Sequence, residues 1–540
     1  MARLFILGLD GGTLDLILPW ARNGRLPHFA RLLEGGSWGP LKSVPNMNTA
    51  PAWSSFMTGV NPGKHGVFWF AEEGEDPGTV RFVNAADRRA PTLWRLLSDA
   101  GKRVGVVNVP LTFPVEQVNG VMIAGFDAPS TSSDGFSHPP GLLEEIQKRT
   151  GPYLMHAPLT GHAAAGRHER VIEEALKAEE SRVAAALALV REQPWDVFMY
   201  MIKATDQAAH YLWQYGAGEQ SRMRPIYEYA DRALGRFLEA AGPDCGVLVM
   251  SDHGMGWRQP AAEYLNDILE QLGYLKRAER TGQGAIHRAH RLARSLGPRA
   301  RGFAKKRLPG LYRRYGYKVR FGGIDWSRTR AYCDNTRSCV WINLEGRNPR
   351  GIVPPAEYKA LAEELREVLQ SLVDIETKRS VVDGVWFPQE QYSGPYVDRA
   401  PDLQIDWRYE KPVGGLLYEG PLGRAESSRA AKGFMHELTG AHRPLGVLIG
   451  CGPQFAEGHR IEGARIEDVA PTVLHALGVP VPEDMDGRVA TEALAPRLAS
   501  APVSYAASRG EDGGSAAGQT DYSDEEAAQV EERLRSLGYI

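Results

Sequence analysis

Short apolar runs that end at acidic residues recur along this chain. Three of them are Ile6–Leu9 before Asp10, Val197–Ile202 before Asp206, and Gly246–Ser251 before Asp252 and His253. Continuous apolar runs of this length are typical of strands buried in a parallel sheet. Open α/β sheets place their sites at the carboxyl ends of such strands. The pattern therefore predicts an α/β fold with carboxylates gathered at one sheet edge.

Amphipathic segments alternate with these strands. Leu14–Leu33 and Arg167–Gln193 space their apolar residues as helices that cover a sheet do, and strand-like Val104–Val109 continues the alternation. Residues 127–165 are instead rich in Ser, Gly, Pro and His and show little periodicity. A lid-like surface excursion is expected there.

Thr49 stands at the start of a predicted helix. It follows the turn-rich segment Pro45–Asn48, and Pro51 suits the first turn of a helix. One interpretation makes Thr49 the N-cap of that helix. The other places its hydroxyl at the positive end of the helix dipole, where an alkoxide forms more easily. The two interpretations are compatible.

Asp206 and His210 are four residues apart, so both lie on one face of a helix. The pair suits two ligands of one metal ion, but the same spacing also occurs in ordinary solvent-exposed contacts. His442 precedes the apolar run Val447–Ile449 and is either a turn histidine or a further ligand.

Composition narrows the class of protein. The chain has 540 residues, of which 43% are hydrophobic and 24% charged, and its formal net charge is -3. These values are ordinary for a globular protein, and specific nucleic-acid binding is not expected. The apolar runs are too short for a signal-peptide core or a membrane span. The four cysteines lack zinc or redox spacing, so we expect free thiols and a cytoplasmic protein.

Residues 276–323 form a strongly basic segment, with fifteen Lys and Arg residues against one acidic residue, Glu279. The segment is either a helical insertion packed on the core, or a surface for an anionic membrane or substrate. We expect it to be a cap inserted into a catalytic core made of residues 1–275 and 324–490. Residues 491–540 are expected to form a flexible tail, in which Ser523 and Glu526 make the capping box of a short helix.

Several motifs occur in a fixed order along the chain: Asp10, Thr49-x-Pro51, Asn61-Pro62-Gly63-Lys64-His65-Gly66, Asp206-x-x-x-His210, Ser251-Asp252-His253-Gly254, Gly440-x-His442 and Asp468-Val-Ala-Pro-Thr472. The ordered set resembles the alkaline phosphatase superfamily, specifically its type I phosphodiesterase and nucleotide pyrophosphatase branch and the bacterial phosphohydrolases related to it. This resemblance implies an alkaline-phosphatase-like three-layer α/β/α sandwich with cap insertions.

The resemblance also implies two divalent metal ions, usually zinc and sometimes manganese. One ion would be held by Asp206, His210 and His442, and the other by Asp10, Asp252 and His253, with the Thr49 oxygen reaching it. Mixed carboxylate and imidazole ligands suit zinc, and two ions about 4 Å apart can clamp the attacking and leaving oxygens. Thr49 would attack phosphorus, and water would hydrolyse the phospho-threonine intermediate.

Two positions depart from relatives. In nucleotide pyrophosphatases an asparagine contacts the phosphoryl oxygen at the position matched here by Phe70, so Asn46, Asn48 or Lys64 are candidates to replace it. Sulfatases need a Cys or Ser for formylglycine followed by x-Pro-x-Arg, whereas this chain has Thr49-x-Pro51-x-Trp53. That difference argues against sulfatase activity.

Three functions stay open. The first is a two-metal phosphoric ester hydrolase that cleaves a small-molecule diester or pyrophosphate through Thr49. The second is a phosphotransferase similar to the cofactor-independent sugar phosphate mutases, which share the metal clusters and retain the phosphoryl group. The third is a membrane-associated anion-binding protein with little turnover. Seven intact candidate positions favour the enzymes over the third function.

Overall fold

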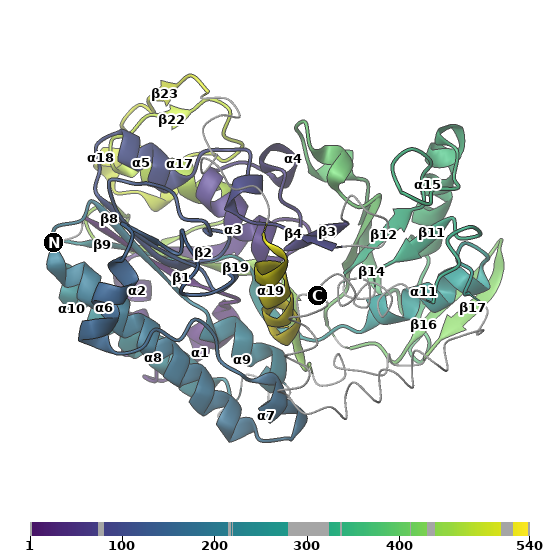
Figure 1. Ribbon diagram of the computed structural model, residues 1–540, viewed down its shortest axis with the longest axis horizontal. Helices are drawn as coiled ribbons and strands as arrows, with labels where there is room; N and C mark the ends of the chain where they lie inside the picture. Colours follow the sequence, from purple (N-terminus) through teal and green to yellow (C-terminus); the bar gives the residue numbers. More distant parts are fainter. Residues whose placement is uncertain are drawn as a thin grey trace.

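A mixed sheet lies between two layers of helices in the computed structural model (Figure 1). The structure describes residues 3–73, 80–213, 218, 220–278, 323–334, 337–410, 412–428, 438–508 and 522–537. Within these ranges the sheet has ten strands, in the order β20-β2-β19-β9-β1-β8-β5-β6-β7, with β21 paired to β2. Their bounds are β1 Leu4–Leu9, β2 Ser37–Lys42, β5 Val104–Val109, β6 Gly120–Ala124, β7 Ser137–His138, β8 Val197–Ile202, β9 Gly246–Ser251, β19 Leu445–Cys451, β20 His459–Arg460 and β21 Ala464–Arg465.

The three strands predicted from their apolar runs are neighbours in this sheet. β1 pairs in parallel with β8 and β9, so that Leu9 lies opposite Ile202 on one side and Ser251 on the other. Every residue of the three strands is buried. The chain segments that follow them therefore leave the sheet at one common edge, as the pattern predicts.

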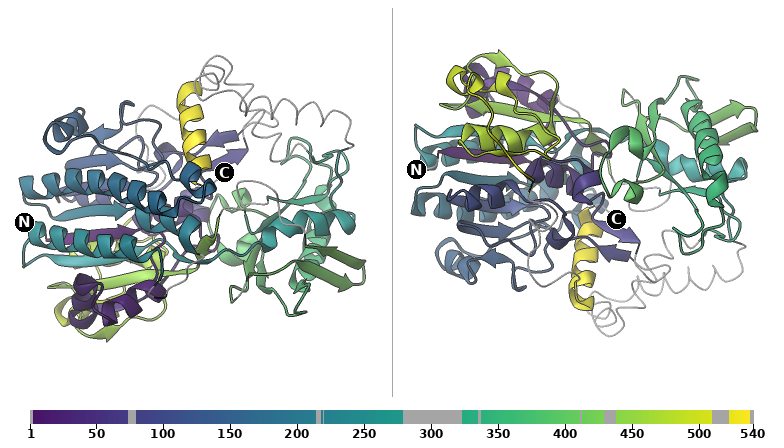
Figure 2. Two further views of the ribbon diagram at one scale, coloured as in Figure 1. Left: turned by 90° about the horizontal axis from the view of Figure 1, so that it is seen from below. Right: turned by 90° about the horizontal axis from the view of Figure 1, so that it is seen from above.

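Helices cover both faces of the sheet (Figures 1 and 2). One face carries α1 Leu14–Arg22, α2 Pro27–Gly35, α6 Leu142–Thr150, α8 His168–Glu192, α9 Ala204–Leu212 and α10 Arg224–Ala241, and the other carries α3 Thr49–Thr58, α5 Leu93–Asp99 and α17 Val469–Ala476. The α/β/α sandwich is confirmed. The helix expected over 14–33 is divided into α1 and α2, because Gly24 in the break takes a positive φ of 78°.

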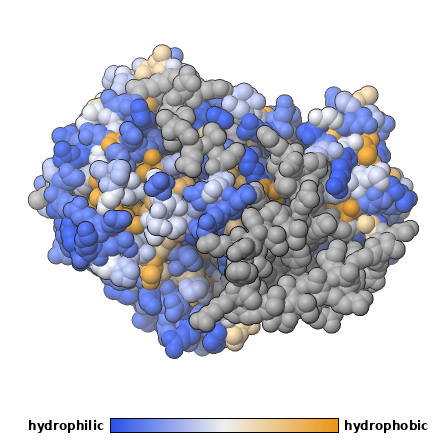
Figure 3. Space-filling view, in the orientation of Figure 1, coloured by the Kyte–Doolittle hydropathy of each residue, from blue (hydrophilic) through white to orange (hydrophobic). Residues whose placement is uncertain are grey.

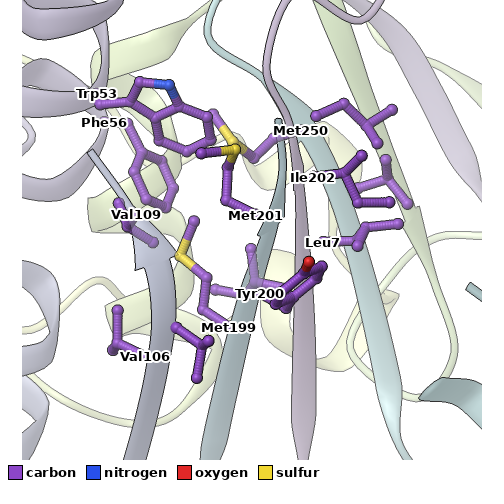
Figure 4. Packing of buried hydrophobic residues seen from close by; sticks show 14 of the residues in the cluster. Leu7, Trp53, Phe56, Val106, Val109, Met199, Tyr200, Met201, Ile202 and Met250 are labelled. Carbon is purple, nitrogen blue, oxygen red and sulfur yellow. The ribbon is translucent and has the colours of Figure 1, made fainter. Parts of the chain in front are cut away.

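Alternate residues of β8 pack against these two helical layers. Met199 and Met201 face Trp53 and Phe56 of α3, whereas Tyr200 points to the opposite side (Figure 4). There its ring lies 5.2 Å from that of Phe237 in α10. Burial on both faces explains why this strand is apolar throughout rather than alternating.

A second hydrophobic core lies beside the sandwich (Figure 2). It is built from α11 Ala261–Gln271, α15 Pro355–Gln370, a four-stranded sheet of β11 Ala331–Cys333, β12 Cys339–Ile342, β15 Leu403–Trp407 and β14 Val382–Trp386, and a three-stranded sheet of β13 Val373–Asp374, β16 Leu416–Gly420 and β17 Gly423–Ser427. We call the described residues of 258–387 and 402–428 the second domain.

The second domain can be compared with the expected division of the chain, which stays a prediction. Most described residues of 324–428, which are expected in the catalytic core, contribute to the second domain. Tyr392, Val397 and Ala400 instead cluster with Phe68 and Trp69 of the sandwich. The chain returns to the central sheet only with β19. Short strands and one amphipathic helix give the same sequence pattern in either domain, so the pattern does not tell which sheet they join. Residues 279–322 of the expected basic cap lie outside the described residues.

Residues 127–165 pack on the sandwich, although a lid-like surface excursion is expected there. Leu143, Ile146, Met155 and Leu159 are buried in its core, and α6 and α7 Thr160–Ala164 contact α8. The helices are too short to give a clear periodicity in the sequence.

The C-terminal helix, α19 Asp524–Leu537, has the predicted capping box. The Ser523 amide donates to Glu526 Oε2 at 3.0 Å, and the Glu526 amide donates to Ser523 Oγ at 3.3 Å. Val530 and Leu534 of this helix are buried in the core of the sandwich. The end of the expected tail is thus packed against the body of the protein.

Other observations bear on the surface and on the cysteines. Among the described helices, none is both long and apolar enough to cross a membrane. All four cysteines are free thiols, as predicted. On the face shown in Figure 3, the coloured surface is mainly hydrophilic with scattered apolar residues.

Candidate metal centre

Asp10, Asp252 and His253 meet at the edge where β1 and β9 end, and we call them the first ligand group. One ligand atom from each lies within 4.8 Å of the others. His253 Nε2 is 3.6 Å from Asp10 Oδ1 and 3.3 Å from Asp252 Oδ2. All three side chains have an exposed fraction of 0%. Asp10 lies about 240 positions before Asp252 and His253 in the sequence, and the parallel pairing of β1 with β9 brings them together.

Backbone contacts fix the orientation of the first ligand group. Gly11 donates its amide to Asp252 Oδ1 at 3.1 Å, and His253 Nδ1 lies 3.0 Å from the Gly254 carbonyl. A proton on Nδ1 leaves Nε2 free to bind a metal ion. Gly11 has a φ of 62°, and a Cβ there would lie 2.9 Å from Met255, so glycine is required.

Asp206, His210 and His442 form the second ligand group. Asp206 Oδ1 lies 3.1 Å from His210 Nε2 and 3.3 Å from His442 Nε2. The two Nδ1 atoms face backbone carbonyls, at 3.1 Å from Gly440 and 2.7 Å from Met47. Asp206 is only 1% exposed, which excludes the ordinary solvent-exposed pair.

His442 reaches the site on a short strand. β18 Gly440–Arg443 pairs antiparallel with β10 Gly254–Trp257, which directly follows His253, and Met255 lies opposite His442. The His253 and His442 rings stack with centroids 3.7 Å apart. Asp206, His253 and His442 also place ligand atoms within 4.8 Å of one another. The two ligand groups are therefore in direct contact.

Thr49 lies beside the first ligand group. Its Oγ1 is 3.3 Å from His253 Nε2, and the residue is completely buried. Thr49 is the first residue of α3, and Asn48 is the N-cap, with its Oδ1 accepting the Ala50 amide at 3.3 Å. Capping by Asn48 leaves the Thr49 hydroxyl at the positive end of the helix, directed toward the ligand groups.

A cleft of about 170 Å³ opens next to the second ligand group, between the sandwich and the second domain. Its wall includes Asn46, Asn48, Trp69 and His442 from the sandwich and Arg337, Trp407 and Tyr409 from the second domain. Phe70 is buried and packs against Phe126, with centroids 6.1 Å apart. Lys64 does not line the cleft, because its ammonium is held by Asp486 Oδ1 at 2.5 Å and by the Asp484 carbonyl at 2.8 Å.

Lys203 is a functional candidate that the sequence reasoning missed. Its Nζ lies 2.8 Å from Asp10 Oδ2 and 2.7 Å from Asp206 Oδ2, and the residue is 2% exposed. In the sequence, a lysine directly after an apolar strand is typical of a strand end that is exposed to solvent. The only signal available was its position between an apolar run and Asp206.

Charge and burial set the pKa values of the three carboxylates. Burial raises the pKa of Asp10 to about 7 and raises that of Asp252 well above its usual value. Burial acts in the same direction on Asp206, but Lys203 and the neighbouring histidines hold its pKa well below the usual range. A site in which carboxylates are buried this closely favours a bound cation.

Fold and site together define a member of the alkaline phosphatase superfamily. Within it, the chain belongs to the type I phosphodiesterase/nucleotide pyrophosphatase family, whose profile matches residues 4–408. The chain is accordingly a phosphoester hydrolase. A search of curated proteins gives no match.

Solved structures similar to this chain include the human ectonucleotide pyrophosphatase/phosphodiesterase 5, with 12% identity over 91% of this chain and 99% of that one and a TM-score of 0.48. The murine protein of the same name, in complex with AMP, has 11% identity over 92% and 100% of the two chains and a TM-score of 0.48. Phosphonoacetate hydrolase from Sinorhizobium meliloti 1021, in complex with phosphonoformate, has 17% identity over 88% and 96% and a TM-score of 0.49.

Proposed function

We propose that the chain is a two-metal phosphodiesterase of the nucleotide pyrophosphatase type that acts through Thr49. The observation that carries this proposal is the meeting of two Asp/His groups with a buried threonine hydroxyl at one sheet edge. Family membership makes phosphoester hydrolysis the reaction. The number of ions and the nucleophile are the proposed parts.

The donor set fits divalent metal ions. Asp10 Oδ1 and Asp252 Oδ2 are buried without a hydrogen-bond partner in the described structure, and both lie near His253 Nε2. Such orphaned acceptors are unfavourable unless a cation binds them. Asp10, Asp252, His253 and Thr49 would hold one ion, and Asp206, His210 and His442 the other. Mixed oxygen and nitrogen ligands suit zinc and also accept manganese.

Thr49 is placed to be the nucleophile. Bound divalent ions would supply positive charge that stabilises an alkoxide and the phosphoryl oxygens. The Thr49 Oγ1–P bond forms as the bond between phosphorus and the leaving oxygen breaks, which gives a phospho-threonine. Water then attacks that phosphorus and restores the Thr49 hydroxyl. The position of Thr49 at the start of α3 favours the negative charge that develops on Oγ1 before it attacks phosphorus and again as water displaces it.

The cleft supports a small-molecule substrate, either a phosphate diester or a pyrophosphate. Its aromatic and guanidinium wall would contact the leaving group. Asn48 and Asn46 line the cleft close to Thr49 and are the proposed replacements for the asparagine that Phe70 displaces. Lys64 is not retained as a substrate contact, because Asp486 holds its ammonium.

Two expectations about the surroundings of the enzyme stay predictions. Four free thiols favour the cytoplasm. Binding of the basic segment to an anionic membrane concerns residues outside the described ranges. Flotation with anionic and neutral liposomes at low and high salt tests it, since electrostatic binding requires the anionic lipid and weakens with salt.

Steady-state hydrolysis of a nitrophenyl phosphate diester and the matching monoester, with zinc or manganese, tests the proposed function. We expect metal-dependent cleavage that favours the diester. Thr49→Ala should lower kcat by at least about a thousandfold with little loss of bound metal. Thr58→Ala, at the other end of α3, is the matched control. Undiminished turnover by the Thr49 variant would reject the nucleophile, and monoester preference would indicate a phosphatase.

A further inference from the structure

Lys203 connects the two ligand groups. Its ammonium contacts Oδ2 of Asp10 and Oδ2 of Asp206 at 2.8 and 2.7 Å. The other oxygen of each carboxylate faces histidine nitrogens, because Asp10 Oδ1 lies 3.6 Å from His253 Nε2 and Asp206 Oδ1 lies 3.1 Å from His210 Nε2. Lys203 thus contacts one carboxylate oxygen in each ligand group, and the Oδ1 atoms of Asp10 and Asp206 remain directed toward the metal positions.

The backbone of Lys203 is itself held in place by a buried carboxylate. Glu179 of α8 is 0% exposed, and its Oε2 accepts the amides of Lys203 and Ala204 at 3.1 and 2.9 Å. Arg182 donates to the same oxygen at 2.7 Å, and the Tyr200 hydroxyl donates to Glu179 Oε1. Glu179 therefore fixes the start of α9, from which both Lys203 and Asp206 project.

The side chain of Lys203 is confined as well. Its Nζ lies 4.3 Å from the centroid of the Phe126 ring, so an aromatic face closes the space that the two aspartates leave open. Burying a lysine to this extent is unfavourable unless opposite charges surround it. Asp10 and Asp206 supply those charges. The position of the ammonium is therefore determined by both ligand groups together with Phe126.

We propose that Lys203 is a positioning residue of the metal centre, and this inference rests on the proposed function. By occupying Oδ2 of Asp10 and of Asp206, it restricts each aspartate to binding an ion through one oxygen. Because a single ammonium contacts both carboxylates, it also fixes the spacing between the two metal positions. It further offsets one of the three negative charges of Asp10, Asp206 and Asp252.

Loss of the Lys203 ammonium should affect the spacing between the two proposed ions. Without the ammonium, Oδ2 of each aspartate loses its contact with Lys203, and each carboxylate can then bind its ion through both oxygens. The spacing of the ions then changes, and the weaker of the two ions is lost first. A lysine that acted only as a buried counter-ion would influence stability and not this spacing.

Manganese binding to Lys203→Met tests the inference, because methionine replaces the lysine side chain as far as Cε and removes the ammonium. Wild-type protein should bind two Mn²⁺ ions per chain and show the electron paramagnetic resonance signal of an exchange-coupled pair. In the variant we expect that signal to be lost or altered and the affinity for the second ion to fall by about tenfold or more. Lys64→Met, which removes the ammonium paired with Asp486, is the matched control and should leave the coupled signal unchanged.

A second variant keeps the test decisive if Lys203→Met does not fold. Lys203→Gln retains N–H donors without the charge, and circular dichroism establishes whether it is folded. An unchanged coupled signal with wild-type affinity in the folded variants would overturn the role of Lys203, even if their melting temperature falls. Wild-type protein that binds no divalent metal ion would instead reject the proposed function itself.

Discussion

The two ligand groups differ in how the chain builds them. The first group follows directly from the ends of two adjacent parallel strands, and all of its side chains are fully buried. The second group combines one turn of α9 with the short strand β18 and borders the cleft, where the His442 side chain is 16% exposed. Sheet register thus makes the first group rigid, whereas the second depends on packing between segments far apart in sequence.

This difference implies a division of work at the proposed centre. Thr49 approaches the first group, through His253, at the buried end of the site. In the second group, His210 and His442 line the cleft that is proposed to hold the substrate. The first group is therefore suited to activate the nucleophile, and the second to contact the substrate.

Replacement of an aspartate in the first group should have the largest effect. Asp252→Asn removes a buried charge opposite His253, and we expect loss of one ion per chain and a fall in kcat of about a thousandfold. Metal analysis and steady-state kinetics measure both. Asp244→Asn, an exposed residue just before β9, should change neither. Full metal content in the Asp252 variant would contradict the ligand assignment.

Replacement of a histidine in the second group should be milder. His442→Ala should release the other ion and lower kcat by about a hundredfold, with the first ion still bound. His459→Ala on the exposed strand β20 is the control. If both ions are lost together in this variant, the two ligand groups do not bind metal independently, which contradicts the proposed difference between them.

Glu179→Gln should weaken metal binding by the second ligand group, because Glu179 holds the start of α9, which carries Asp206 and His210. It weakens acceptance of the Lys203 and Ala204 amides at the start of α9, and we expect kcat to fall by about tenfold. Urea unfolding should show a stability loss of roughly 1–3 kcal/mol. The adjacent Glu180→Gln disturbs a more exposed pair with Arg236 and should have little effect on kcat. Equal effects of both variants on kcat would exclude positioning by Glu179.

The smallest effect concerns pH and the first group. Burial raises the pKa of Asp10 to about 7, so below that pH metal binding must displace a proton. Affinity for zinc or manganese should therefore increase as pH rises toward 7, by at most about tenfold per unit for this one proton. Titration calorimetry in buffers of different ionisation enthalpy counts the protons released. Affinity that does not change between pH 6 and 8 would contradict this shift.

The contrast also separates what the sequence could predict from what it could not. Apolar runs identify β1, β8 and β9, and parallel pairing then places Asp10, Asp206 and Asp252 at one edge without further information. His442 joined the site only through the family resemblance, because β18 has four residues and no periodicity of its own. Its partner strand β10 is far away in the sequence, because the second domain lies between β10 and β18 along the chain.

Lys203 and the second domain show two further limits. A single lysine after a strand gives no sign of burial, because the carboxylates that hold it come from two separate strands. The residues of the second domain alternate strands and a helix as the sandwich does, so their separate core appears only from the contacts. The predicted start of α3 is wrong by only one position, because the N-cap is Asn48 and not Thr49.

The place of β19 in the sheet has a consequence for synthesis on the ribosome. β19 lies between β2 and β9, although it is made after the whole second domain. A nascent chain that has not yet exposed residue 451 lacks the strand that joins β2 to β9, and it also lacks the packed His442 that precedes β19. The second ligand group is therefore complete only after the second domain has been made. Metal capture at the second position is therefore expected after capture at the first, whose ligands Asp10, Asp252 and His253 all precede the second domain in the chain.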